Sequence, residues 1–167
     1  MGILGIGGLG HLALKFGIHH GCETVALSRD ESKRKYCQEI GVHKYVNLEE
    51  KAQSKTLVGY LDAILVTAGG VINWTELLSY LAPKGTLIIL GLAKNPIDVP
   101  ATALILGQKT VCGSAARSSQ IVSRMLNFCA LHKITPDVET FGFENINAAL
   151  AHTASGKAKF RTVLVRA

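Results

Sequence analysis

The stretch GIGGLG at residues 5–10 matches the pattern G-x-G-x-x-G, and it decides how the rest of the sequence is interpreted. In this pattern Gly5 permits a tight turn, Gly7 lets the backbone approach a pyrophosphate, and Gly10 allows a helix to pack closely on a strand. A phosphate at such a turn meets free N–H groups and the positive end of the helix dipole. Glycine-rich turns also join strands to helices for packing alone. The flanking sequence favours dinucleotide binding, because an apolar run precedes the turn and a segment of helical periodicity follows it.

Outward from this turn, short apolar runs alternate with longer segments of helical periodicity, which is typical of parallel strands joined by crossover helices. The fold class expected is α/β: a doubly wound (Rossmann) parallel sheet of about six strands with helices on both faces, forming one domain over residues 1–167. We expect strands at 3–6, 24–27, 44–48, 61–67, 86–90, 109–112, 138–143 and 160–165. We expect helical segments at 9–17, 30–40, 49–59, 74–81, 101–106, 117–132 and 144–153. The order of the strands in the sheet is not predicted.

The composition excludes several classes of protein. Of the 167 residues, 48% are hydrophobic and 18% are charged, which is enough apolar content for a core of ordinary size. The net charge of +6 includes no run of five like charges, so we expect no nucleic-acid partner. The apolar runs are far shorter than the roughly 18 residues that span a bilayer, so we expect no membrane span and a cytoplasmic protein. The four cysteines form no C-x-x-C pair and are expected to be buried.

The end of the second expected strand bears on the choice of coenzyme. A carboxylate at this position accepts hydrogen bonds from a free ribose 2′-hydroxyl, but this chain has Ser28 followed by Arg29. A hydroxyl, this guanidinium and Lys33 suit a 2′-phosphate, so NADP is preferred over NAD. Two alternatives stay open. The basic residues could simply solvate the start of a surface helix, and Asp30 could turn toward a ribose.

Five stretches together resemble the coenzyme-binding, C-terminal domain of zinc-dependent medium-chain alcohol dehydrogenases, within the NADP-dependent, cinnamyl alcohol dehydrogenase-like branch. The resemblance covers nearly the whole chain, and each stretch is weak evidence without the others. The stretches are GIGGLGHLALKFG at 5–17, ALSRDESK at 26–33, GLAKNP at 91–96, LILGQKTVCGS at 104–114 and INAALAHTASGKAKFRTVLV at 146–165.

The resemblance implies roles for particular residues. It implies that the glycine turn holds the pyrophosphate, that the end of the second strand holds the 2′-phosphate, and that Thr67 lies near the adenosine half. Backbone contacts to the nicotinamide are implied for two further turns, and an edge strand at 109–113 is implied to pair with a second copy in a homodimer. Arg161, in a basic C-terminal stretch, is kept as a further candidate for a phosphate. The implied coenzyme residues are Gly5, Gly7, Gly8, Leu9, Gly10, Ser28, Arg29, Lys33, Thr67, Leu90, Gly91, Leu92, Gly113 and Ser114.

In this family the zinc-binding catalytic domain precedes the glycine turn, and here Met1 lies four residues before Gly5. Catalytic residues and zinc ligands are therefore expected to be absent from this chain. The sequence also contains no H-E-x-x-H motif and no Cys/His spacing suited to tetrahedral zinc. His11 is expected to pack on its helix or lie near a phosphate. The expected function is the NADP(H)-binding domain of a zinc-type alcohol dehydrogenase-like oxidoreductase, which transfers hydride between nicotinamide and an alcohol or aldehyde and is incompetent alone. The alternative is a stand-alone dinucleotide-binding or interaction module that docks on a separate catalytic chain.

Overall fold

The computed structural model describes residues 1–115 and 118–166. Its centre is a six-stranded sheet in which every pair of neighbouring strands is parallel, in the order β3-β2-β1-β4-β5-β6. This order confirms the expected doubly wound sheet, because the chain runs outward from β1 to one edge and then from β4 to the other. The strands are β1 (Gly2–Leu4), β2 (Val25–Ser28), β3 (Lys44–Asn47), β4 (Leu61–Val66), β5 (Leu81–Ile89) and β6 (Thr110–Gly113).

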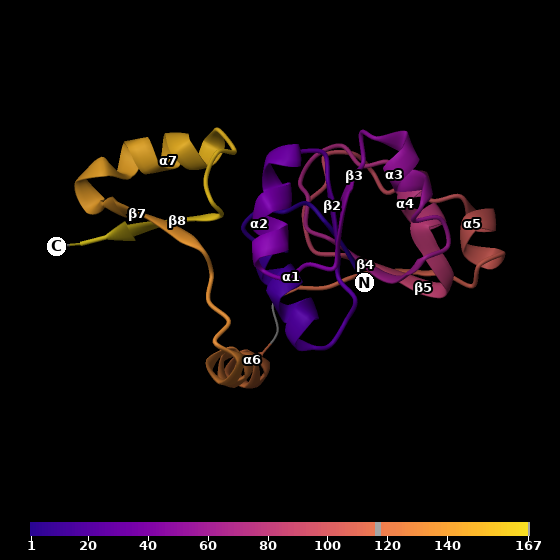
Figure 1. The fold of residues 1–167 in the computed structure, drawn as a ribbon, viewed down its shortest axis with the longest axis horizontal. Coiled ribbons are helices and arrows are strands. Elements are labelled where there is room, and N and C mark those ends of the chain that lie inside the picture. Colours follow the sequence, from indigo (N-terminus) through magenta and orange to yellow (C-terminus); the bar gives the residue numbers. More distant parts are fainter. Residues whose placement is uncertain (116–117, 167) are drawn as a thin grey trace.

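Helices cover both faces of this sheet (Figure 1). Successive strand side chains point to opposite faces, so Ile3 belongs to one buried cluster and Leu4 to the other. The first cluster includes side chains of α1 (Gly10–His19) and α2 (Arg34–Glu39). The second, larger cluster includes Trp74 and Leu78 of α4 (Trp74–Tyr80). Two shorter helices, α3 (Lys51–Lys55) and α5 (Ala101–Ile105), complete that side.

The last part of the chain leaves this sheet. After α6 (Ser119–His132) come β7 (Val138–Gly142), α7 (Ile146–Ala154) and β8 (Arg161–Val165), and the two strands pair in parallel with each other in a separate sheet. We call residues 138–165 the C-terminal unit. Figure 1 shows it beside α2, at some distance from the large sheet. The last two expected strands therefore form, but outside the six-stranded sheet.

Some expected boundaries were wrong. The helix expected at 49–59 covers only Lys51–Lys55, and the strand expected at 86–90 starts earlier, at Leu81, with an irregular register against β4. The helix expected from 117 starts at Ser119, and residue 117 lies outside the described residues. The apolar residues Ile121, Val122, Met125 and Leu126 of α6 are 38–56% exposed, so this helix adds no buried residue to the core.

The cysteines also differ from expectation. Cys37 is buried, whereas Cys112 is exposed on β6, so the expectation of four buried thiols was wrong. Within the residues that the structure describes, no helix is long and apolar enough to cross a bilayer.

Candidate functional site

The glycine turn between β1 and α1 is built from two glycines that the fold requires. Gly5 has a φ of +90°, which other residues rarely adopt, and a Cβ there would lie 2.8 Å from the Cβ of Ala68. A Cβ on Gly10 would lie 1.9 Å from the carbonyl oxygen of Gly5. The contact at Gly5 follows from the close approach of the loop after β4, and the contact at Gly10 from the close approach of α1 to the turn. The sterics at these two positions therefore agree with the roles expected from the sequence.

Gly7 is different, because the fold does not require a glycine there. It is exposed, its φ is outside the positive range, and a Cβ built on it meets no atom within 4 Å. The open space lies at the N-terminus of α1, where no side chain caps the helix and no acidic residue occupies the first turn. Such an end leaves N–H groups and the positive end of the helix dipole available to an anion.

Thr67, which follows β4, holds the turn in place. Its Oγ1 lies 2.6 Å from the carbonyl oxygen of Gly5 and 2.9 Å from that of Leu4, and its backbone N–H donates to Leu4 at 3.0 Å. Thr67 was expected near the adenosine half of a coenzyme, and the structure places it at the wall of the cleft described next.

A cleft of about 750 Å³ opens at the carboxyl ends of β1, β2 and β4, where the strand order reverses direction. Ligands bind at this point in open parallel sheets. The cleft brings together six of the predicted coenzyme residues from three different loops. They are Gly5, Gly7, Ser28, Arg29, Lys33 and Thr67.

A second hollow of about 470 Å³ lies at the carboxyl ends of β5 and β6. Gly91 lines this hollow, and a Cβ there would lie 2.8 Å from the carbonyl oxygens of Thr67 and Ala68. Glycine at position 91 therefore lets the loop after β5 approach the loop after β4. All five residues expected to contact the nicotinamide line this hollow: Leu90, Gly91, Leu92, Gly113 and Ser114.

Arg29 extends across the first cleft. It is exposed, and its Nη2 lies 3.2 Å from the position that a Cβ on Gly70 would take, so the guanidinium lies beside the loop after β4. Lys33 also lines the cleft, with its Nζ 5.4 Å from the centre of the Phe160 ring. Ser28 is buried, and its Oγ accepts the N–H of Asp30 at 3.1 Å.

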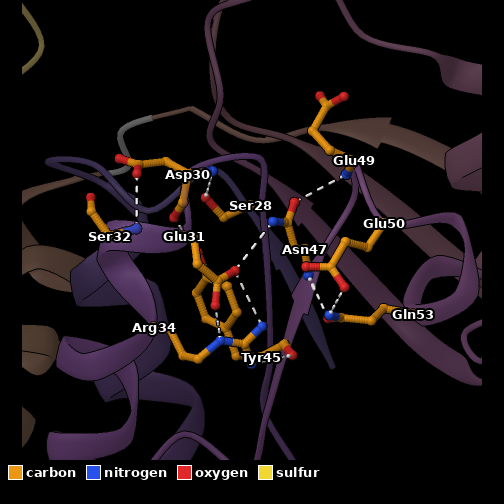
Figure 2. A network of polar contacts seen from close by, with 10 residues as sticks. All are labelled: Ser28, Asp30, Glu31, Ser32, Arg34, Tyr45, Asn47, Glu49, Glu50 and Gln53. Carbon is orange, nitrogen blue, oxygen red and sulfur yellow. Dashed lines mark hydrogen bonds and ion pairs between the residues drawn. The ribbon is translucent and has the colours of Figure 1, made fainter.

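The acidic residues next to Arg29 are engaged within the protein (Figure 2). Asp30 caps a short 3₁₀ helix (Glu31–Lys33) by accepting the N–H of Ser32 at 3.0 Å, and hydrogen bonding from Ser32 lowers the pKa of the Asp30 carboxyl. Glu31 forms an ion pair with Arg34 and accepts a hydrogen bond from Asn47 at 3.2 Å. A hydrogen bond from a ribose to Asp30 would compete with the hydrogen bond that Asp30 accepts from Ser32.

Two contacts join the turn to distant parts of the chain. Arg161, at the start of β8, donates from Nε to the carbonyl oxygen of Gly8 at 3.1 Å. His11 is fully buried, which confirms the expected packing role, and its Nδ1 lies 2.9 Å from the carbonyl oxygen of Gly7. Asp137, which was not among the residues expected here, donates its N–H to His11 Nε2 at 3.2 Å. No local pattern predicts a contact between residues 126 positions apart.

Leu9 and Gly10 complete the turn without lining the first cleft. Leu9 is 48% exposed and ends the turn as the residue before α1, while Gly10 is buried beneath it. Among the residues that the structure describes, no group of three or more His, Cys, Asp or Glu side chains is placed to hold a metal ion. The described residues therefore do not fit a zinc site.

The comparisons with known proteins agree on one family. The family described as zinc-binding dehydrogenase matches residues 8–130. The chain is 36% identical over 162 residues to aldehyde reductase AdhA of Synechocystis sp., covering 97% of this chain and 48% of the relative. It is 34% identical over 165 residues to cinnamyl alcohol dehydrogenase 2 of Arabidopsis thaliana, and the match covers 98% of this chain and 44% of that relative.

Solved structures give the same result. A cinnamyl alcohol dehydrogenase from Sorghum bicolor is 30% identical and superimposes with a TM-score of 0.93, covering 98% of this chain and 46% of that one. CAD from Helicobacter pylori, solved in complex with NADP(H), is 28% identical with a TM-score of 0.85, and the match covers 98% of this chain and 46% of that one. This chain thus spans about half the length of the relatives that it matches.

Proposed function

This chain belongs to the zinc-binding dehydrogenase family, and from that premise we propose that it binds NADP(H) as the coenzyme half of an alcohol dehydrogenase-like oxidoreductase. The observation that carries the proposal is the open space at Gly7. The fold leaves this position empty at the uncapped N-terminus of α1, where a diphosphate can accept hydrogen bonds from the turn. The CAD structure from Helicobacter pylori contains NADP(H), which supports the same coenzyme here.

When bound, NADP(H) donates or accepts a hydride at its nicotinamide ring. The contribution of this chain is to hold and orient the coenzyme. The glycine turn binds the diphosphate, and the loops after β5 and β6 hold the nicotinamide against Gly91 and Ser114. Leu92, which lines that hollow, is 92% exposed, so this side of the hollow faces solvent. We expect the alcohol or aldehyde to approach from that side, and little turnover from the described residues alone.

The preference for NADP over NAD rests on the arrangement around Arg29. A 2′-phosphate near Ser28 would lie within reach of a guanidinium that extends over the cleft, and charge-assisted hydrogen bonds to phosphate are strong. One oxygen of the Asp30 carboxylate accepts the N–H of Ser32, which holds this side chain at the start of the 3₁₀ helix, so a contact with a free ribose hydroxyl would compete with that bond.

The test is equilibrium titration of the 167-residue chain with NADPH and NADH, followed by the fluorescence of the reduced nicotinamide. We expect tighter binding of NADPH. Arg29→Gln should weaken NADPH binding by about tenfold, which corresponds to about 1.4 kcal/mol, and leave NADH binding unchanged. Lys35→Gln removes the same charge from an exposed side chain of α2 and serves as the control. Equal and very weak binding of both coenzymes by the unmodified chain would refute the proposal.

We also propose a homodimer formed through β6. This strand is the last in the sheet order, and Cys112 and Gly113 on it are exposed. An edge strand with unpaired backbone groups is a template for pairing with another chain. Sedimentation equilibrium at micromolar concentration should give the mass of two chains, and a monomer mass throughout would refute this arrangement.

A further inference from the structure

His11 joins the glycine turn to the chain segment that enters the C-terminal unit. The ring is fully buried on α1, and both of its nitrogens have partners. Its Nε2 accepts the backbone N–H of Asp137 at 3.2 Å. A neutral imidazole has one donor and one acceptor nitrogen, so the proton is on Nδ1, which donates to the carbonyl oxygen of Gly7 at 2.9 Å.

Asp137, at the other end of the contact with His11, is held by further interactions. The carboxylate of Asp137 accepts hydrogen bonds from Lys15 Nζ at 2.8 Å and from the Tyr36 hydroxyl. Burial opposes ionisation of Asp137, but these two donors outweigh it and lower the pKa of the carboxyl. The Phe160 ring stacks on the His11 ring, with centres 4.7 Å apart and planes 12° apart. The residues just before β7 and just before β8 therefore both meet α1 and α2 at this point.

Together with the first backbone hydrogen bond of α1, these side-chain contacts fix which way the peptide groups of the turn point. In a trans peptide the N–H points away from the carbonyl oxygen that precedes it. The Gly7 carbonyl accepts both the backbone N–H of His11 at 3.1 Å and the Nδ1–H of its ring at 2.9 Å, so the N–H of Gly8 points to the opposite, open side. The Gly8 carbonyl points toward Arg161, which in the same way directs the N–H of Leu9 outward. Two N–H groups are thus available to a diphosphate because two carbonyls have partners behind the turn.

We propose that His11 is a positioning residue that holds the Gly7–Gly8 peptide ready for a diphosphate and couples this turn to the C-terminal unit. The inference rests on the proposed binding of NADP(H). Because the link is shared, a ligand that stabilises the turn also stabilises the segment around Asp137, and the coupling is reciprocal. His11 contacts neither coenzyme nor substrate in this account; it acts through the carbonyl of Gly7 and the N–H of Asp137.

Two substitutions separate the two ends of the link. In His11→Asn the side-chain amide lies near the position of Nδ1 and keeps a donor for the Gly7 carbonyl. In His11→Gln the longer side chain places its amide near Nε2 and keeps an acceptor for Asp137. We expect the Asn variant to bind NADPH within about twofold of the unmodified chain, and the Gln variant to bind about five- to tenfold more weakly, the effect of one hydrogen bond. Thermal unfolding of both variants checks that they are folded.

A second measurement on the same proteins reports the coupling. We expect NADPH to slow hydrogen exchange of the β7 amides in the unmodified chain and in neither variant, because each variant breaks one of the two bonds. Residues 138–142 lie outside the residues that line the two hollows, so direct contact with the coenzyme does not explain such protection. Equal NADPH affinities of the Asn and Gln variants, or β7 protection that persists in both, would overturn the role of His11. Absence of NADPH binding by the unmodified chain would instead refute the proposed function.

Discussion

Replacing Gly7 with alanine tests whether this glycine serves the ligand or the fold. The structure offers open space for the added methyl group, and the φ of Gly7 is not in the positive range. The free energy of unfolding should therefore stay the same or rise by up to about 1 kcal/mol, because alanine reduces the conformational freedom of the unfolded chain. A diphosphate, however, would have to approach the backbone where the methyl group now lies.

The loss of binding can be estimated from the bonds at stake. Keeping the diphosphate away from the turn costs at least one charge-assisted hydrogen bond, worth about 1.5–3 kcal/mol. NADPH affinity should then fall by about 10- to 100-fold in Gly7→Ala. The matched control is Gly10→Ala, whose Cβ would lie 1.9 Å from the backbone oxygen of Gly5 and 2.9 Å from Thr67 Oγ1. Because that contact is with backbone, we expect Gly10→Ala to lose about 1–3 kcal/mol of stability or more.

The assay combines urea unfolding, followed by circular dichroism, with fluorescence titration of NADPH for both variants. Gly7→Ala should be stable but bind weakly, whereas Gly10→Ala should already be destabilised without ligand. If Gly7→Ala bound NADPH as well as the unmodified chain, the diphosphate would lie elsewhere. If it lost as much stability as Gly10→Ala, the argument that the fold leaves this space empty would be wrong.

Three further outcomes are expected. Burial lowers the pKa of His11 below its ordinary value of 6.5, so as the pH falls below about 6.5 the unfolded chain binds a proton that the folded chain does not. The contribution of His11 to stability is therefore complete above about pH 6.5 and is lost as the pH falls. The difference in the free energy of unfolding between pH 5 and pH 7.5 should be smaller in His11→Gln than in the unmodified chain. Thr67→Val removes the hydroxyl that hydrogen-bonds the carbonyl oxygens of Leu4 and Gly5. It should cost about 1 kcal/mol in urea unfolding, and an unchanged midpoint would contradict its role in holding the turn. Asp30→Ala removes the cap on Ser32 and should cost about 1 kcal/mol while leaving NADH affinity unchanged; a clear loss of NADH affinity would instead place Asp30 on a ribose.

Much of the candidate site could be predicted because its parts are local in sequence. The glycine turn follows from the steric needs of a strand, a sharp turn and a helix within ten residues. The expected nicotinamide residues at 90–92 and 113–114 come from two neighbouring strand ends, and parallel strands bring their carboxyl ends to one edge. The resemblance to a known family added the assignment of each loop, and eleven of these residues line the two hollows, whereas Gly8, Leu9, Gly10 and Arg161 do not.

The sequence by itself determined the alternation of strands and helices and the turn at residues 5–10, since hydrophobic periodicity and glycine sterics act over a few neighbouring residues. Only the tertiary structure decided that Gly7 faces open space while Gly10 does not, and that the carboxylate of Asp30 is occupied beside Arg29. It alone revealed the contact between His11 and Asp137, and it placed the last two strands in a sheet of their own. These features depend on how segments far apart in the sequence pack against each other. The periodicity of one sequence does not indicate which distant backbone group a given side chain contacts.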